Sequence, residues 1–361
     1  MKKKKPLWKR ILRVAGIIVL VIVIAFVGLL SYLSVTEFRP EDQETVEVKG
    51  KSTRKLNPGD SITLMTWNCG YGALGDNADF FMDGGTHVNT ADETRVEKNL
   101  KGLQNEIDSV NPDVVFLQEV DTDSSRSHHI NEVNEFTSHE SDKESTFAYN
   151  FKVGFIPYPL PPIGKVNSGI LTMSSYDLKD STRYQLPCPF KWPVRLGNLK
   201  RCVMVDRIPI EGTDKYLIIA NLHLEAYDDG EGKTAQTKML KDILEKEYRK
   251  GNYVIAGGDF NQTFSSVDDS AYPPQEGKWA SGRIDVSTFE KGWQFHMDPS
   301  VPTCRSLDQP LKGADKDTFQ YYVIDGFITS PNITVSSCKT QDVGFKNTDH
   351  NPVVIQFSMN R

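Results

Sequence analysis

Several apolar stretches of this sequence end in residues that can bind a cation or transfer a proton. Ionised groups are costly to desolvate, so a charged side chain at the end of an apolar strand usually caps a sheet edge, pairs with an opposite charge or binds a metal. Each residue alone has such a structural explanation, but six such strand ends in one chain point to a shared site. The residues are Asn68, Glu119, His223, Asp259, Asn261, Asp325, Asp349 and His350.

The chemistry available to this set is that of a cation and a phosphoryl group. Carboxylate and amide oxygens without cysteine suit a hard cation such as Mg²⁺ or Mn²⁺ and argue against zinc. Such an ion neutralises charge on phosphate oxygens, and a histidine beside a carboxylate can activate water or protonate a leaving oxygen near neutral pH. If folding brings these residues together, the pattern predicts hydrolysis of a phosphate ester with Mg²⁺ or Mn²⁺ as cofactor.

Buried β-strands are needed to position these residues, and the sequence predicts them. The runs SITLMTWN and DVVFLQEV are short and apolar, as is typical of strands buried on both faces. One amphipathic helix is expected after Thr90 and Glu93, which have capping-box spacing, and continues to Val110; a second is expected from Lys233 to Lys250. Strands are expected at 61–68, 113–120, 169–173, 203–208, 216–224, 253–257, 322–329 and 352–357. This mixture favours mixed sheets with helices on their outer faces.

In their order along the chain, the motifs resemble those of the endonuclease/exonuclease/phosphatase superfamily, in particular its deoxyribonuclease-like and neutral sphingomyelinase-like branch. The matching segments run from about residue 61 to residue 357 and are TWN, LQEVD, SGILTMS, NLHLE, GGDFN, IDGF and TDHNPV. QE, GDFN and TDH in this order are together highly specific, whereas each alone is weak. The resemblance implies an α/β fold, a four-layer sandwich of two mixed β-sheets flanked by helices.

The resemblance also implies which residues bind the metal and the phosphate. Glu119 matches the glutamate that binds the catalytic metal, with Asn68 beside it, and Asp349 matches a position that helps to hold the metal site. Asp259 and Asn261 match the pair that orients the attacking water and contacts the phosphate.

Proton transfer is assigned by the same resemblance. His350 matches the histidine that acts as a base or stabilises the transition state, and Asp325 matches the carboxylate that orients it. His223 matches a histidine on the leaving-group side in the deoxyribonuclease and sphingomyelinase branches, which makes the abasic-site endonuclease branch a poorer match. Arg126 is expected to contact the phosphate by analogy, and a solvated surface arginine is the alternative interpretation.

A single apolar stretch near the N-terminus has the length of a membrane span. From Val14 to Leu33 every residue is apolar, small or aromatic, and 20 such residues span about 30 Å as a helix. We expect a basic cytoplasmic segment at 1–13 and a transmembrane helix at 14–35 of a single-pass cell-membrane protein, with the rest of the chain outside the cytoplasm. A cleaved signal peptide is the alternative, but no A-x-A-like site follows the apolar run.

The remaining residues are expected to form a polar linker at 36–60 and one catalytic domain at 61–361. With 38% hydrophobic and 25% charged residues, the composition is that of a globular protein. Seven of the 42 basic residues lie in the first 13 positions, which leaves 35 basic against 48 acidic residues in the rest. This acidic balance does not favour broad nonspecific binding of nucleic acid, although a metal-loaded site can still attract a polyanion locally.

Two smaller features leave alternatives open. The five cysteines permit a bridge between Cys188 and Cys202 or between Cys304 and Cys338, but a domain of this size does not need one, and buried free thiols are favoured. The loop at 70–89 is rich in glycine and aspartate and is either a solvated surface loop or part of the mouth of the site.

The leading functional hypothesis is a phosphodiesterase outside the cytoplasm that acts on a lipid head group or a nucleic acid. A membrane tether raises the local concentration of surface substrates and so favours lipid; an extracellular endonuclease is the alternative. A hypothesis of another class is a catalytically silent binding domain displayed on the membrane. Loss of a metal-binding or water-orienting residue would be its signature, and none is missing. No protein partner is inferred.

Overall fold

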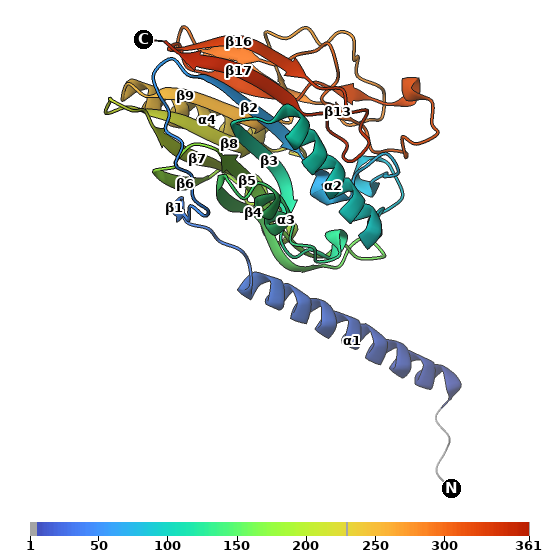
Figure 1. Ribbon diagram of the computed structural model, residues 1–361. Coiled ribbons are helices and arrows are strands. Elements are labelled where there is room, and N and C mark those ends of the chain that lie inside the picture. The colour runs from blue at the N-terminus through green and yellow to red at the C-terminus, as the bar shows by residue number, and fades with distance from the viewer. Residues whose placement is uncertain (1–5, 229, 361) are drawn as a thin grey trace.

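Two large β-sheets packed face to face form the body of the molecule, and one long helix projects from it (Figure 1). The computed structural model describes residues 6–228 and 230–360. Residues 1–5, which belong to the predicted basic segment, lie outside the described residues.

The first sheet has six strands and the second has seven. The first, in spatial order, contains β16 (Ile333–Thr340), β17 (Val353–Met359), β2 (Ser61–Asn68), β3 (Val114–Asp121), β5 (Gly164–Ser174) and β4 (Glu144–Ile156). The second contains β1 (Gln43–Val46), β6 (Asp180–Gln185), β7 (Cys202–Pro209), β8 (Tyr216–His223), β9 (Tyr253–Asp259), β15 (Asp325–Thr329) and β12 (Gln294–His296). Within each sheet one pair is parallel, β2 with β3 and β8 with β9, while the other pairs are antiparallel. Both sheets are therefore mixed, as expected.

A buried layer of mostly apolar side chains separates the two sheets. Residues that alternate along each strand point into it, so that Leu64 and Phe116 of one sheet belong to the same buried cluster as Ile219 and Ile255 of the other. These four side chains have no exposed surface. Burial of such side chains is the main force that holds the sheets together, since each contributes about 1.5–3 kcal/mol.

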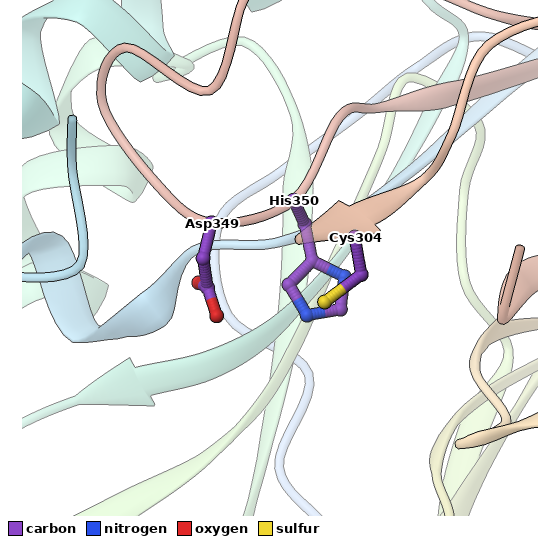
Figure 2. Close-up of side chains that lie close together, drawn as sticks. All are labelled: Cys304, Asp349 and His350. Carbon is purple, nitrogen blue, oxygen red and sulfur yellow. The ribbon is translucent and has the colours of Figure 1, made fainter. Parts of the chain in front are cut away.

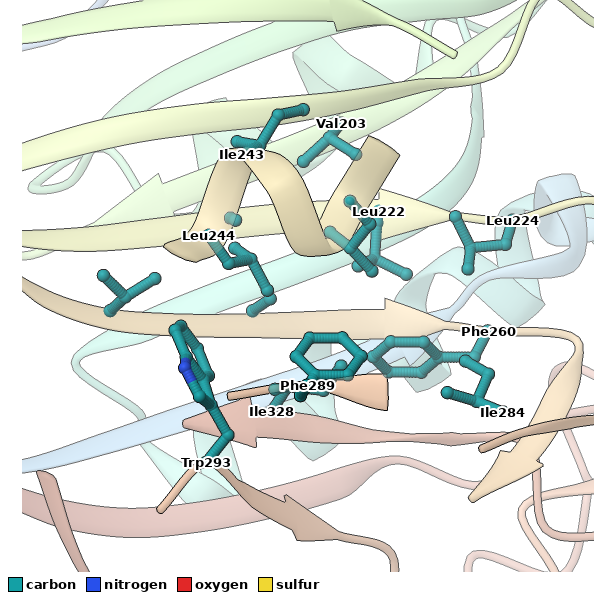
Figure 3. Packing of buried hydrophobic residues seen from close by; sticks show 14 of the residues in the cluster. Val203, Leu222, Leu224, Ile243, Leu244, Phe260, Ile284, Phe289, Trp293 and Ile328 are labelled. Atoms are coloured by element: carbon teal, nitrogen blue, oxygen red, sulfur yellow. The ribbon is translucent and has the colours of Figure 1, made fainter. Parts of the chain in front are cut away.

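Helices cover the outer face of each sheet and complete four layers. α2 (Glu93–Val110) and α3 (Glu132–His139) lie on the six-stranded sheet, where Leu100 and Leu103 join the cluster that contains Trp67. α4 (Glu231–Arg249) lies on the seven-stranded sheet, and Figure 3 shows Ile243 and Leu244 beside the strand residues packed under it. The predicted four-layer sandwich is confirmed.

The expected strands and helices are present, with differences at their ends. α2 begins two residues later than the capping box implies, because Asp92 accepts the hydrogen bond from the Arg95 N–H, while the Thr90 hydroxyl donates to the carbonyl of Ala73. The predicted strand at 322–329 is split into β14 (Tyr321–Tyr322) and β15. The remaining short strands are β10 (Gln262–Phe264), β11 (Gly282–Ile284) and β13 (Cys304–Arg305). The 3₁₀ turns are Gly70–Gly72, Phe81–Asp83, Ser125–Ser127, Val194–Gly197, Val286–Thr288 and Lys316–Thr318.

The N-terminal helix α1 spans Leu7–Val35 and is the one described helix that is long and apolar enough to cross a membrane. It begins before residue 14, so the predicted basic segment continues into its first turns. The segment expected to be a linker is partly folded onto the domain, since β1 pairs with β6 and Leu56 is completely buried. All five cysteines are free thiols in the structure.

Asp206 on β7 is a buried carboxylate between the sheets and makes stability depend on pH. Thr146 Oγ1 donates to it over 2.9 Å, and burial raises its pKa to about 6. Between about pH 4 and pH 6 the folded chain therefore binds this proton while the unfolded chain releases it, so stability falls as pH rises through this window. Asp206→Asn should remove this contribution and gain up to about 3 kcal/mol relative to the parent protein above pH 6.

Thermal unfolding in detergent at pH 4 to 8 measures this effect on the full-length chain. The melting temperatures of the parent and Asp206→Asn should separate as the pH rises to 6 and then stay a constant distance apart. Parallel curves across the whole range would contradict the assignment.

Candidate active site

Three neighbouring strands of the seven-stranded sheet place three of the predicted residues in one row. His223 at the end of β8 lies opposite Asp259 at the end of β9, and Asp259 lies opposite Asp325 at the start of β15. Cross-strand neighbours project from the same face of a sheet. The pairing register therefore brings an imidazole and two carboxylates to one edge of the sandwich.

Gly258 allows β9 to approach β8 closely at this point. Its φ of 148° is in a region that side chains rarely adopt, and a Cβ at this position would lie 1.9 Å from the carbonyl oxygen of Leu222 on β8. Any other residue would push β9 away from β8 or distort the backbone. The glycine that precedes Asp259 in the GGDFN motif thus has a steric role.

Asn68 connects the two sheets at the site. Its Nδ2 donates to Asp259 Oδ2 over 3.0 Å and to Glu119 Oε1 over 3.2 Å, while its Oδ1 accepts the Gly70 N–H. Glu119 itself has a φ of 55° at an irregularity in the pairing of β3 with β5. One amide therefore fixes the relative position of two carboxylates that come from different sheets.

His350 lies beside two of the carboxylates. Its Nδ1 is 2.9 Å from Asp325 Oδ2, and its Nε2 is 3.8 Å from Asp259 Oδ2. Burial alone would lower the pKa of His350, but the adjacent Asp325 carboxylate outweighs burial and holds the pKa well above its usual value. The predicted pairing of Asp325 with His350 is present, and it favours a protonated imidazole.

The pKa of His223 is shifted in the opposite direction to that of His350. Its Nε2 is 3.4 Å from Asp259 Oδ2, and the guanidinium of Arg201 donates to its backbone carbonyl over 3.4 Å. Burial lowers the pKa of His223 well below its usual value, and the charge of Arg201 adds to this. The site therefore combines one neutral and one charged imidazole on either side of Asp259.

Asp259 and Asn261 are joined by the backbone between them. The Asn261 N–H donates to Asp259 Oδ1 over 2.8 Å, and Asn261 Nδ2 donates to the carbonyl of Leu224 over 2.9 Å. Burial and the nearby Asp325 raise the pKa of Asp259. This carboxylate is thus poised to accept a proton rather than to remain a fixed anion.

Arg126 points its guanidinium toward the site from the turn after β3. It donates two hydrogen bonds to Asp121, over 3.0 Å from Nε and 2.9 Å from Nη2, and it lies over the ring of Tyr71 at 3.6 Å from the centroid. This side chain is only 14% exposed. The structure therefore does not support the alternative of a solvated surface arginine.

Most of the predicted site residues line one cavity of about 510 Å³, namely Glu119, Arg126, His223, Asp259, Asn261, Asp349 and His350. Asn68 and Asp325 lie directly behind its wall, in contact with lining residues. The loop at 70–89 contributes apolar walls at the mouth through Phe80, Phe81 and Met82, so it belongs to the site.

The oxygen ligands fit a hard divalent cation, with Glu119 and Asp349 as the residues that would hold it. Burial raises the pKa of Glu119, Arg126 opposes this, and the negative charge of Asp349 adds to the rise. A buried carboxylate near a second negative charge is the kind of group that a cation stabilises. As placed, the amide nitrogen of Asn68 faces Glu119, so Asn68 orients this carboxylate and does not offer its oxygen.

A second grouping around Asp349 does not fit such an ion as well. Cys304, Asp349 and His350 lie with their ligand atoms within 4.8 Å of one another (Figure 2). Burial raises the pKa of the Cys304 thiol to about 12, so the sulfur stays protonated. A neutral thiol is a poor ligand for a hard cation.

The fold and the site together define a class of protein. A four-layer sandwich with carboxylates, two imidazoles and a buried guanidinium at one edge is suited to hydrolysis of phosphate esters. The sequence model of the Endonuclease/Exonuclease/phosphatase family matches residues 65–344. The chain belongs to this family, whose members are in general dependent on divalent metals.

Solved structures support the fold. The endonuclease/exonuclease/phosphatase from Beutenbergia cavernae is 16% identical, with 83% of this chain and 72% of that chain covered and a TM-score of 0.56. The human Nocturnin catalytic domain with bound sulfate is 17% identical, with 87% and 97% covered and a TM-score of 0.53. The endonuclease/exonuclease/phosphatase from Bacteroides vulgatus is 14% identical, with 83% and 100% covered and a TM-score of 0.52. No curated protein matches the chain at a significant level.

Some residues of the site were not foreseen from the sequence. Tyr71 supports Arg126, Arg201 contacts the backbone of His223, and Tyr227 donates to Asp83 Oδ1 over 3.3 Å at the cavity wall. Each lies in a loop or at the start of a strand without a motif. Their roles depend on contacts between segments distant in sequence.

Gly258→Ala should destabilise the protein by at least about 3 kcal/mol, because the added methyl group collides with a strand carbonyl and the backbone is strained. Gly197→Ala is the matched control, since nothing lies within 4 Å of a Cβ there. Thermal unfolding of both variants in detergent measures the difference. Equal melting temperatures would show that β9 does not require a glycine.

Mg²⁺ or Mn²⁺ should raise the melting temperature of the parent protein by about 5 °C at roughly 100 times the dissociation constant. Glu119→Gln should abolish this shift, because it removes one of the two proposed anionic ligands. Glu97→Gln on the exposed surface of α2 should retain it. An undiminished shift in Glu119→Gln would place the cation elsewhere.

Proposed function

We propose that this protein is a phosphodiesterase that uses Mg²⁺ or Mn²⁺ and acts outside the cytoplasm at the surface of the membrane that anchors it. The observation that supports this most directly is the arrangement around Asp259, whose Oδ2 lies within 4 Å of both His223 and His350. A carboxylate between one neutral and one cationic imidazole can take a proton from water and pass it on, while a positive charge remains beside the phosphoryl group.

The proposed mechanism assigns the chain's residues as follows. Asp259, whose pKa is raised, accepts a proton from the attacking water, and the backbone N–H of Asn261 holds this carboxylate in place. His350, kept cationic by Asp325, stabilises the negative charge that develops on the phosphoryl oxygens. A bound divalent cation held by Glu119 and Asp349 would neutralise further charge on the same group.

Two other residues complete the proposed assignment. Arg126 contributes a fixed positive charge to the cavity and contacts a phosphate oxygen of the bound substrate. His223 lies on the leaving-group side, where burial keeps its pKa low and the ring neutral before the reaction. The proton that Asp259 takes from the water passes through His223, whose Nε2 is 3.4 Å from Asp259 Oδ2, to the leaving oxygen as its bond to phosphorus breaks.

The membrane location rests on α1 and on the charges that precede it. We propose that α1 anchors the chain with its N-terminus in the cytoplasm, because basic residues are concentrated before the apolar run. The substrate is then a phosphate ester outside the cytoplasm, either a lipid head group or a nucleic acid. An extracellular endonuclease is the alternative within the same reaction class.

A catalytically silent binding domain is the alternative of another class. Such a domain would be expected to lack one or more of the metal-binding or proton-transferring groups. The complete set, brought to one cavity, supports an enzyme instead.

Glu119→Ala and His350→Ala should each reduce hydrolysis of bis-p-nitrophenyl phosphate by about 10²–10⁴-fold without unfolding the chain, because one removes a cation ligand and the other a charged group at the phosphoryl site. His139→Ala is a matched control, since His139 pairs with Asp108 at the surface. Initial rates of the purified full-length variants in detergent check this prediction.

Chelation provides an independent check on the same preparation. EDTA should abolish turnover, and added Mg²⁺ or Mn²⁺ should restore it. Parent activity in both site variants would remove the proposed site, and full activity after exhaustive chelation would exclude the metal-dependent mechanism.

A further inference from the structure

Exposed apolar side chains outside α1 are concentrated in two loops. Among the described residues, these loops are the tip of the β4–β5 hairpin (residues 154–162) and the turn at residues 191–194. We call them the apolar loops. Their exposed large apolar side chains are Phe155, Tyr158, Leu160, Trp192 and Val194, and the two others, Met82 and Tyr227, line the cavity. Leu160 is 88% exposed and Trp192 is 55% exposed, which is unfavourable in water.

The elements that carry the apolar loops are packed against the end of α1. Leu33 of α1 is only 8% exposed and lies in one cluster with Val153, Val166 and Leu196. Leu29 and Leu30 pack against the same cluster. Figure 1 shows α1 leaving the domain at this side.

Polar contacts fix the same junction. Trp192 Nε1 donates to Ser34 Oγ over 3.1 Å, and the carboxylate of Glu37 lies 3.1 Å from Arg195 and 3.5 Å from Lys200. The side chain of Glu37 is 3% exposed, so its carboxylate is shielded from water, whereas Arg195 is 41% exposed. The domain is therefore attached to α1 in a defined orientation and not through a free tether.

The depth of this junction follows from the length of the apolar run. Leu29 and Leu33 are the last part of the 20-residue stretch that begins at Val14, and they cover about 6 Å of a span of about 30 Å. If α1 spans the bilayer as proposed, side chains that pack on these residues lie at the depth of the outer end of the hydrocarbon. The exposed tips beside them then face lipid and not water.

The same loops adjoin the active site. Phe151, Ile156, Tyr158 and Ile163 of the β4–β5 hairpin line the cavity. The ring of Tyr158 packs edge-on against Phe81 at the mouth, with centroids 6.0 Å apart. An apolar surface thus continues from the junction with α1 to the mouth of the cavity.

We propose that the apolar loops insert into the interface of the lipid bilayer and hold the mouth of the cavity against it, so that the cavity takes phosphodiester head groups of membrane lipids. The substrate class rests on the proposed phosphodiesterase activity, and the insertion rests on the proposed anchoring by α1 but not on that activity. Tryptophan and tyrosine are the residues that favour this interface, because one end of each ring system is apolar and the other is polar. Exposed Lys152 and Lys191 flank the tips, where lipid phosphates would lie.

Insertion is tested with Trp192 as the probe. Full-length parent protein and Trp192→Phe are reconstituted in vesicles of phosphatidylcholine and phosphatidylglycerol, with and without bromine on the acyl chains. Bromolipid quenching of tryptophan fluorescence should be clearly smaller in Trp192→Phe, because the quenching of Trp8 in α1 is common to both proteins. Identical quenching in the two proteins would overturn the insertion.

The substrate class is tested with a variant outside the cavity. Leu160→Ser combined with Val194→Ser should reduce hydrolysis of vesicle lipid at least 5-fold and leave turnover of bis-p-nitrophenyl phosphate unchanged, because neither residue lines the cavity. Ser336→Ala, an exposed position on β16 at the edge of the molecule far from α1 (Figure 1), is the control and should change neither rate.

The outcomes separate the two proposals. Parent protein that hydrolyses the soluble diester and a DNA oligonucleotide, but not vesicle lipid, overturns the lipid substrate and leaves the phosphodiesterase intact. Parent protein that hydrolyses none of the three overturns the proposed function, while the quenching experiment still decides the insertion. An unchanged rate on vesicle lipid in the double variant overturns the role of the apolar loops in substrate access.

Discussion

The spacing between the two sheets is the constraint on which the site depends. A layer of side chains without exposed surface, among them Leu64, Phe116 and Ile255, keeps the sheets at a fixed separation. Where this layer ends, the same separation allows Asn68 of one sheet to reach Asp259 of the other over 3.0 Å. Because interiors are close-packed, a change of even one methylene in the layer is transmitted to this hydrogen bond. The geometry of the site is therefore a property of the core.

The protonation states of the two buried histidines are set by the charged side chains next to them. Both histidines are buried, yet their pKa values move in opposite directions, because His350 has Asp325 as a direct partner while His223 lies near the positive charge of Arg201. Burial alone would have made the two alike. The same carboxylate, Asp259, lies between them, so small displacements of either ring would alter which group holds a proton.

The sequence predicted those parts of the fold that depend on local pattern. Strands such as 61–68 and helices such as α2 were recognisable because their apolar residues recur at the period of the element. β1 was not recognisable, because three of its four residues are polar and the strand gains its place only by pairing with β6. The site residues at strand ends could be predicted from the sequence. The contact of Arg126 with Tyr71 and the orientation of the Asn68 amide could not, because they depend on contacts between segments that are distant in sequence. Trp192 has no motif, and its position beside Ser34 appears only in three dimensions.

The ion pairs of the buried Glu37 carboxylate have a kinetic consequence. A domain joined to α1 by Arg195 and Lys200 cannot swing freely, so in the proposed orientation its cavity stays at one height above the bilayer. Encounters with substrate then occur by lateral diffusion in two dimensions, and the rate is governed by the mole fraction of the lipid in the leaflet and not by its bulk concentration. Dilution of that lipid with an inert one would slow the reaction even when the total amount of substrate is constant.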